Sequence, residues 1–250
     1  MNRKLIAVIA CRNQGTRLYG KPVQNLDIDQ GLTILDYIIC CLKTVKSIDE
    51  IVLAISDEID NKIYENIAIK HKLNYTYGDK NNVLERLYKS ASEFGASDVF
   101  RVTSESPFIY FQNIDKLWKD HKLNDFDATF FDEIIDGCGY EIISINSLKK
   151  SLIEGEAKHK SEFCTLYIRE NIDKFKINKV LPKNKYIRKD LRLTVDYPED
   201  LVVCRKLYNE FSHLKPRIPI NLLIDYLDNN PDQKKILSQF IEDGYNKMYL

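Results

Sequence analysis

The sequence lacks an excess of charge of either sign, with 37 Lys and Arg against 37 Asp and Glu in 250 residues. A chain without net charge has no overall field to attract nucleic acid or an anionic membrane. No apolar run approaches the roughly 20 residues of a membrane-spanning helix. The first residues also lack the apolar segment and small-residue cleavage site of a secretory signal. These absences predict a cytoplasmic protein that binds neither nucleic acid nor membrane.

Paired cysteines and clustered histidines are missing as well. The six cysteines include no C-x-x-C pair, so we expect them to be buried thiols in a reducing compartment. The four histidines are scattered through polar stretches, where we expect them to be exposed. There is no repeat, low-complexity segment or interdomain linker. With 44% hydrophobic residues, the chain is expected to form a single domain over residues 1–250.

Buried strands and amphipathic helices alternate in the first half of the sequence. The expected strands are residues 5–10, 50–56, 74–77 and 98–103, and the expected helices are 33–45, 58–71, 83–95 and 111–124. This alternation predicts an α/β fold, with a mostly parallel sheet flanked by helices. The alternation loosens in a variable excursion over about 127–190. The expected elements beyond it are a strand at 191–196 and helices at 198–211, 220–229 and 232 to about 243.

The stretch from residue 5 to residue 22 joins a buried strand to a cationic loop. Within the loop, three cations and two glycines lie close together, namely Arg12, Gly15, Arg17, Gly20 and Lys21. Glycines let a backbone turn and approach a ligand, and cations bind phosphate, so the loop suits a polyphosphate. The alternative is a solvated turn with scattered basic residues.

A P-loop is one interpretation of this stretch, because Gly15 to Lys21 match G-x-x-x-x-G-K. The motif then requires Ser or Thr, whose hydroxyl binds magnesium, but this chain has Pro22. Residues 23–27 are also irregular, so no helix N-terminus lies where the phosphates would need it. The P-loop interpretation therefore fails.

A family resemblance is the other interpretation. Residues 10–22, ACRNQGTRLYGKP, resemble the A-R-x-x-S-x-R-L-x-G-K signature of cytidylyltransferases that activate sugar acids and related acceptors. Three more stretches match in order: YGDKNNVLERLY (77–88) resembles G-x-x-x-D-V-L-x-R-Y, RVTSESPFI (101–109) resembles R-x-T-x-D-x-P-x-I, and LTVDYPEDL (193–201) resembles L-T-V-D-x-P-E-D-L. The chain thus resembles the spore-coat-polysaccharide-type cytidylyltransferases, relatives of the CMP-sialic acid and CMP-Kdo synthetases.

The resemblance implies a fold and an activity. The expected fold is a single nucleotide-diphospho-sugar-transferase-like domain. The expected reaction is Mg²⁺-dependent transfer of CMP from CTP to an anionic sugar, a sugar acid, or a phosphorylated or phosphonylated metabolite. Pyrophosphate leaves, and the product serves surface polysaccharide synthesis. The resemblance also implies a homodimer to which residues 127–190 contribute.

The resemblance further implies a set of site residues. Those assigned to the nucleotide are Ala10, Arg12, Gly15, Thr16, Arg17, Lys21, Arg86, Thr103 and Ser104, of which the catalytic cations are Arg12, Arg17 and Lys21. The expected magnesium ligands are Glu105 and Asp196, because hard divalent cations prefer carboxylate oxygens. The acceptor is expected to face Glu141 and Glu162.

Each assignment has a structural alternative. Arg86 lies in a helical stretch with acidic neighbours, where it could form a surface ion pair. Asp196 could cap the following helix, and Asp200 could be a first-turn partner of the helix dipole instead of a metal ligand. The three cations of the loop could be ordinary exposed charges.

Four positions depart from the family pattern. Gly15 replaces a serine, Asn82 and Glu105 replace aspartates, and Phe163 replaces a histidine. Phe163 can neither ionise nor hydrogen-bond, so these changes bear mainly on acceptor specificity.

Two other functions compete with cytidylyl transfer. A glycosyltransferase on a similar nucleotide-sugar fold would need a D-x-D metal motif, which Asp125 to Asp127 match in a polar turn. A non-catalytic nucleotide-binding or structural protein would explain the departures at Gly15, Asn82 and Phe163, although the retained cations and two carboxylates argue against it.

Overall fold

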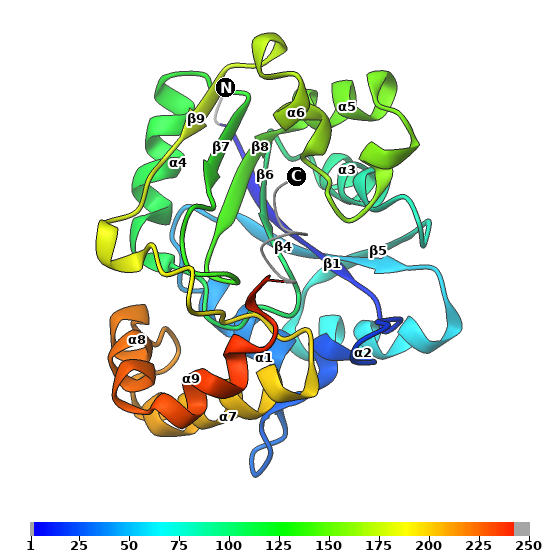
Figure 1. Ribbon diagram of the computed structural model, residues 1–250. Coiled ribbons are helices and arrows are strands. Elements are labelled where there is room, and N and C mark those ends of the chain that lie inside the picture. Colours follow the sequence, from blue (N-terminus) through cyan, green and yellow to red (C-terminus); the bar gives the residue numbers. More distant parts are fainter. Residues whose placement is uncertain (1–2, 243–250) are drawn as a thin grey trace.

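The computed structural model describes residues 3–242 and builds them around one seven-stranded sheet, in the order β5-β4-β1-β6-β8-β7-β9 (Figure 1). Its strands are β1 (Leu5–Cys11), β4 (Glu50–Ser56), β5 (Asn74–Gly78), β6 (Asp98–Val102), β7 (Ala128–Phe131), β8 (Tyr140–Ser144) and β9 (Ile177–Lys179). A separate hairpin pairs β2 (Asn25–Asp27) with β3 (Leu32–Thr33). The first four strands are parallel, and β8 runs antiparallel to both β6 and β7. The predicted mixed, mostly parallel sheet is confirmed.

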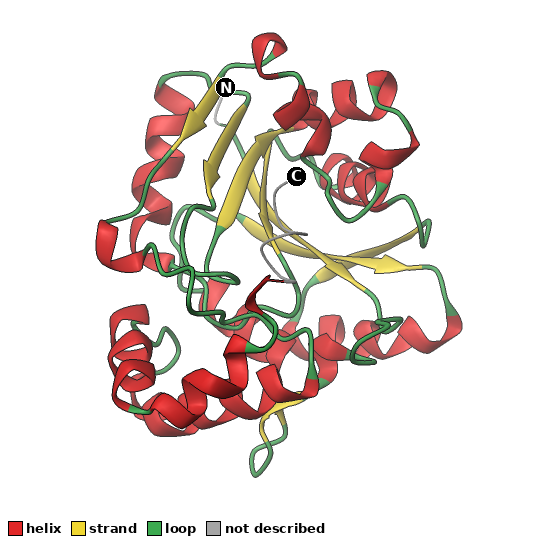
Figure 2. Cartoon of the chain, viewed as in Figure 1, coloured by secondary structure: helices red, strands yellow, loops and turns green. Residues whose placement is uncertain are grey.

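Helices cover both faces of this sheet (Figure 2). One face carries α1 (Ile34–Leu42), α2 (Ile63–His71), α4 (Ile114–Leu123), α7 (Pro198–Phe211) and α8 (Ile220–Asn229). The other face carries α3 (Val83–Glu93), α5 (Ile145–Glu154) and α6 (Leu166–Glu170). α9 (Pro231–Ser238) packs beside α7. Alternate residues of β1 enter the two cores, because successive side chains of a strand point to opposite faces.

The start of α7 lies within the last matched stretch, residues 193–201, and holds its backbone in place. Pro198 occupies the first helical position, where its missing N–H costs nothing. The Asp200 carboxylate accepts hydrogen bonds from the backbone N–H groups of Asp196 and Tyr197, at 2.9 Å each. Asp200 is therefore the first-turn partner that one alternative predicted, and the helix cap is Tyr197 rather than Asp196.

Three expectations about structure need correction. Residues 191–196 do not form a strand; their only ladder contact among the described residues is one bridge between Arg192 and Asp136. The alternation of apolar Leu191, Leu193 and Val195 with polar residues mimics a strand, but all of residues 191–195 are buried and the segment only runs extended between loops. α9 ends at Ser238, and the predicted end near 243 lies outside the described residues. His121 and His159 are buried instead of exposed, because each has polar partners inside the fold.

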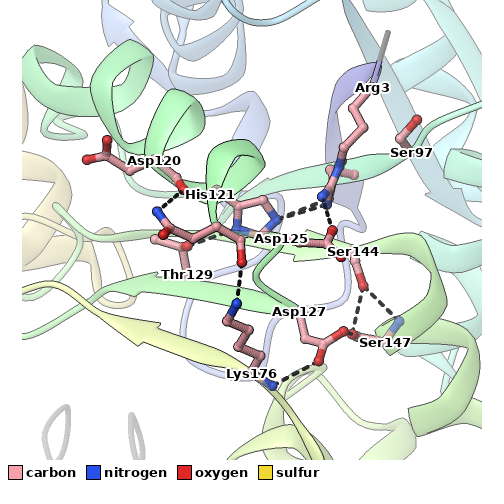
Figure 3. Close-up of polar contacts among 12 residues, drawn as sticks. Arg3, Ser97, Asp120, His121, Asp125, Asp127, Thr129, Ser144, Ser147 and Lys176 are labelled. Atoms are coloured by element: carbon pink, nitrogen blue, oxygen red, sulfur yellow. Dashed lines mark hydrogen bonds and ion pairs between the residues drawn. The ribbon is translucent and has the colours of Figure 1, made fainter. Parts of the chain in front are cut away.

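A polar cluster lies at the amino-terminal edge of the sheet, where strands β1 and β6 begin (Figure 3). Arg3 donates to both oxygens of Asp98, at 2.8 and 2.5 Å, and to Asp125 at 2.7 Å. His121 lies 3.1 Å from Asp98 and 2.8 Å from the Thr129 hydroxyl. The cluster ties the start of β1 to β6, α4 and β7.

None of the helices in residues 3–242 is both long and apolar enough to cross a membrane.

Candidate nucleotide-binding and catalytic site

A cavity of about 410 Å³ opens beyond the carboxyl ends of β1 and β6. The chain leaves β1 toward β4 on one side and returns to β6 on the other, and such switch points are where open α/β sheets bind ligands. The predicted site residues that line the cavity are Ala10, Arg12, Gly15, Arg17, Lys21, Arg86, Thr103, Ser104, Glu105, Glu141, Glu162 and Asp196. Thr16 is exposed and is not among the cavity-lining residues.

The cationic loop is held in a fixed turn by Asn13. Its backbone carbonyl accepts from the N–H groups of Gly15 and Gly20, at 2.8 Å each, and its buried side chain accepts from Tyr64 at 2.7 Å. Gly20 has a φ of +60°, a conformation that suits glycine. A Cβ at Gly15 would lie 2.3 Å from the carbonyl oxygen of Leu18, so this path of the loop excludes the serine of the family pattern.

Asp196 gathers the cations at one end of the cavity. Arg17 and Lys21 both donate to its Oδ1, at 2.8 and 2.5 Å, and Arg192 donates to its Oδ2 at 2.8 Å. Burial opposes ionisation of this carboxyl, but Lys21, Arg17 and Arg192 outweigh it and lower the pKa of Asp196. The loop cations are thus preassembled around a carboxylate that keeps them together.

Arg86 is a buried cation in the same cavity, with 1% of its surface exposed. Its Nη1 donates to the backbone oxygen of Asp79 at 2.9 Å, while its Nε has no hydrogen-bond partner among the described residues. Burial lowers the pKa of Arg86. Arg86 is therefore not the surface ion pair of the alternative interpretation.

Glu105 and Asp196, the two predicted magnesium ligands, both line the cavity. Glu105 is partly buried, and this burial raises its pKa; Lys21 opposes the rise and Asp196 adds to it. No group of three or more Asp, Glu, His or Cys residues within 3–242 is arranged to hold a metal ion unaided. Magnesium shared with substrate phosphates commonly uses only one or two protein carboxylates, so this donor set fits that kind of site.

The other half of the cavity contains an ion-pair network around Glu141. This buried carboxylate accepts from Arg101 at 2.8 Å, from Arg169 at 2.7 Å and from the Thr165 hydroxyl at 2.8 Å. Burial opposes its ionisation, but the two guanidinium groups lower the pKa of Glu141 to about 2. Glu162 is more exposed and accepts from Arg12 at 3.0 Å.

Several cavity residues were not identified from the sequence. Asp136, in the loop between β7 and β8, is only 5% exposed, and burial raises its pKa to about 6. Its nearest cation is Arg192, 4.0 Å away. Arg101 could have been found, because it begins the matched stretch RVTSESPFI, whereas Asp132, Asp136 and Arg169 lie outside every matched stretch.

Two further departures now have a physical setting. Asn82 caps α3, its side-chain oxygen accepting from the N–H of Glu85 at 3.1 Å, and Asn and Asp cap helices equally well. Phe163 lines the cavity on the side of Glu162 and Thr165. The D-x-D of the glycosyltransferase alternative lies elsewhere: Asp125 pairs with Arg3, and Asp127 accepts from the backbone of Lys176.

A model of the cytidylyltransferase family matches residues 6–237 of this sequence. The chain belongs to that family. The prediction of a nucleotidyltransferase is therefore confirmed, and so is the resemblance to the spore-coat-polysaccharide branch, because a relative from that pathway matches over most of the chain.

Two curated relatives span almost the whole sequence. An uncharacterised protein of Methanocaldococcus jannaschii is 27% identical over 245 residues, covering 98% of this chain and 99% of the relative. The spore coat polysaccharide biosynthesis protein SpsF of Bacillus subtilis is 27% identical over 230 residues, covering 91% and 95% of the two chains.

Solved structures share the fold. A cytidylyltransferase of Leptospira borgpetersenii superimposes with a TM-score of 0.84 at 22% identity, over 93% of this chain and 97% of the other. A CMP-2-keto-3-deoxy-manno-octonic acid synthetase in complex with CTP superimposes with a TM-score of 0.61 at 13% identity, over 83% and 99%.

Proposed function

We propose that this protein transfers CMP from CTP to an anionic sugar, a sugar acid, or a phosphorylated or phosphonylated metabolite, and releases pyrophosphate. The observation that carries the proposal is the buried guanidinium of Arg86. Among the described residues its Nε has no hydrogen-bond partner, and Arg86 lines the cavity that also contains Arg17 and Lys21. A buried cation with unused donor capacity is costly unless a ligand anion completes it.

Arg17 and Lys21 would hold the triphosphate. Both donate to Asp196, and triphosphate oxygens would compete with that carboxylate for them. Fixed cations around the departing pyrophosphate stabilise charge where it develops and keep the attacking oxygen in line. Preassembly around Asp196 means that little reorganisation is needed when the nucleotide enters.

Glu105 and Asp196 would hold the magnesium ion. Each oxygen of Asp196 can accept more than one interaction, so the pairs with Arg17, Lys21 and Arg192 leave coordinating capacity. The ion, when bound, neutralises phosphate charge as a Lewis acid. The raised pKa of Glu105 makes its carboxylate a group that gains from a nearby cation.

The half of the cavity around Glu141 would receive the acceptor. Arg101 and Arg169 offer donors to an anionic group, while Glu141 and Glu162 accept from hydroxyl groups. The name of the Bacillus relative, in spore coat polysaccharide biosynthesis, supports a sugar-derived acceptor and a role in surface polysaccharide synthesis.

The deciding experiment measures pyrophosphate release with each of the four NTPs, with and without magnesium, against a panel of sugar acids, sugar phosphates and phosphonates. We expect release only with CTP, magnesium and an anionic acceptor. Lys21→Ala should abolish it, whereas Lys46→Ala, an exposed lysine remote from the cavity, should not. Absence of release from every combination would refute the proposal.

A further inference from the structure

The aromatic ring of Phe240, near the end of the described chain, packs beside the nucleotide site without entering its cavity. It follows α9, which Figure 1 shows beside α7, and stacks on Tyr197 with ring centroids 4.1 Å apart and planes at 17°. Tyr197 caps α7 and directly follows Asp196. The guanidinium carbon of Arg17 lies 5.2 Å from the centroid of the same ring. One tyrosine ring therefore contacts both Phe240 and a cation of the phosphate loop.

A second contact anchors Phe240 at this position. Its backbone carbonyl accepts from Nη1 of Arg192 at 2.7 Å. Arg192 is only 1% exposed, and its Nη2 donates to Asp196 at 2.8 Å. Because the same buried guanidinium fixes both Phe240 and Asp196, the ring of Phe240 has a defined place relative to the site.

Ordering Arg17 matters for phosphate binding. A long side chain loses rotamer freedom when it grips a ligand, and a contact that orders it beforehand reduces that loss. A cation over an aromatic face is attracted by the ring quadrupole, and offset-stacked rings hold each other in place. Tyr197 can order Arg17 only if its own ring is fixed, and the Phe240 ring covers it.

We propose that Phe240 is a positioning residue of the nucleotide site: its ring fixes Tyr197, and Tyr197 orders the Arg17 guanidinium that receives phosphate. The identity of the ligand rests on the proposed function, but the ordering of Arg17 does not. Neither Phe240 nor Tyr197 lines the cavity, so the effect is transmitted through Arg17.

The test compares Phe240→Ala with Phe240→Tyr, which keeps the ring, and with Gln239→Ala, an exposed neighbour. In Phe240→Ala we expect KM for CTP to rise about fivefold, the scale of one lost aromatic pair, with kcat nearly unchanged. Calorimetry should show weaker binding of CTP and unchanged binding of cytidine, which has no phosphate. Phe240→Tyr and Gln239→Ala should both behave as wild type.

A ligand-free measurement separates this inference from the proposed function. The NMR signals of the Arg17 side chain, assigned by comparison with Arg17→Lys, should carry a ring-current shift that Phe240→Ala reduces and Phe240→Tyr keeps. Unchanged Arg17 signals in Phe240→Ala would overturn the inference, as would equal weakening of CTP and cytidine binding. If wild type itself fails to bind CTP, the proposed function fails, and the NMR comparison still decides whether Phe240 orders Arg17.

Discussion

Buried charged groups differ between the two edges of the central sheet, that is, between the amino-terminal and the carboxyl-terminal ends of its strands. At the amino-terminal edge, Asp98 is fully buried, and it is matched by Arg3 and His121 at hydrogen-bond distances. At the carboxyl-terminal edge, the Nε of Arg86 has no partner among the described residues, and burial raises the pKa of Glu105 and Asp136. The buried polar groups of the first edge are satisfied by one another, whereas the second edge contains buried charged groups that are not fully satisfied within the protein.

This difference gives a physical criterion for telling structural charge from functional charge. A buried polar group is tolerated when it is fully satisfied, and it then adds rigidity. A buried polar group that lacks hydrogen-bond or charge partners destabilises the fold. Such groups are therefore expected where a bound ligand supplies the missing partner. The comparison predicts that substitutions at the amino-terminal edge lower stability. Substitutions at the carboxyl-terminal edge should change binding and turnover, and those that remove an unsatisfied charge should raise stability.

The largest effect is expected for Asp196→Asn at the carboxyl-terminal edge. Removing this charge should lower turnover by roughly 100- to 10,000-fold, the scale of a lost electrostatic stabiliser. The melting temperature should fall only moderately, because Arg192 retains its ion pair with Asp200 at 3.1 Å. Turnover is measured against magnesium concentration, with the melting temperature as the control for folding. Near-normal turnover with normal magnesium dependence would remove Asp196 from the metal site.

Asp98→Asn at the amino-terminal edge should have the opposite profile. It leaves Arg3 and His121 without the charge that pairs them, which should cost about 3 kcal/mol in the free energy of unfolding. CTP affinity of the folded protein should be unchanged. Urea unfolding and calorimetry below the melting transition measure the two quantities. A loss of CTP affinity comparable to the loss of stability would contradict the division between the edges.

Asp136→Asn should stabilise the protein in a pH-dependent way. Because the pKa of Asp136 is raised from 3.8 to about 6, the folded state binds its proton more tightly than the unfolded state does. Its contribution to stability is therefore lost as the pH rises from about 4 to about 6. Asparagine removes that loss, a gain of at most about 3 kcal/mol above pH 6.

Urea unfolding at pH 5 and pH 8 tests this change, with the exposed Asp173→Asn as its control. The gain should be larger at pH 8. An equal gain at both values would show that Asp136 does not carry the raised pKa.

The smallest of these effects is expected for Arg17→Ala. The loss of a charge-assisted contact to phosphate should weaken CTP binding about tenfold and leave cytidine binding nearly unchanged. Calorimetry with both ligands checks this, and the exposed Arg217→Ala serves as the matched variant. Similar losses for CTP and cytidine would place Arg17 away from the phosphates.

The sequence predicts the parallel half of the sheet well, for a physical reason. Strands such as β1 and β4 are buried on both faces, so they read as continuous apolar runs bounded by polar residues. Residues 191–196 mislead because an extended segment packed beside a loop shows the same alternation as a strand. Only hydrogen bonding distinguishes the two, and Arg192 makes a single bridge.

The candidate site likewise contains residues that the sequence predicts and contacts that it does not. The first three matched stretches reach one cavity because each follows a strand at the same edge, whereas the fourth, residues 193–201, reaches it as an extended segment that leads into α7. The pair between Arg101 and Glu141 was missed because it depends on β8 lying antiparallel beside β6, where these two residues face each other in register. Nothing local in either segment specifies that pairing.

Gly15 limits which substitutions the phosphate loop can accept. A designer who restores the family serine at this position would expect to add a hydroxyl donor to the loop. The first atom of any side chain would instead meet the Leu18 carbonyl at 2.3 Å, so the loop must open before a hydroxyl can be placed. The residue at position 15 and the path of residues 16–18 are therefore sterically coupled, and a serine variant of this protein requires compensating changes in the loop.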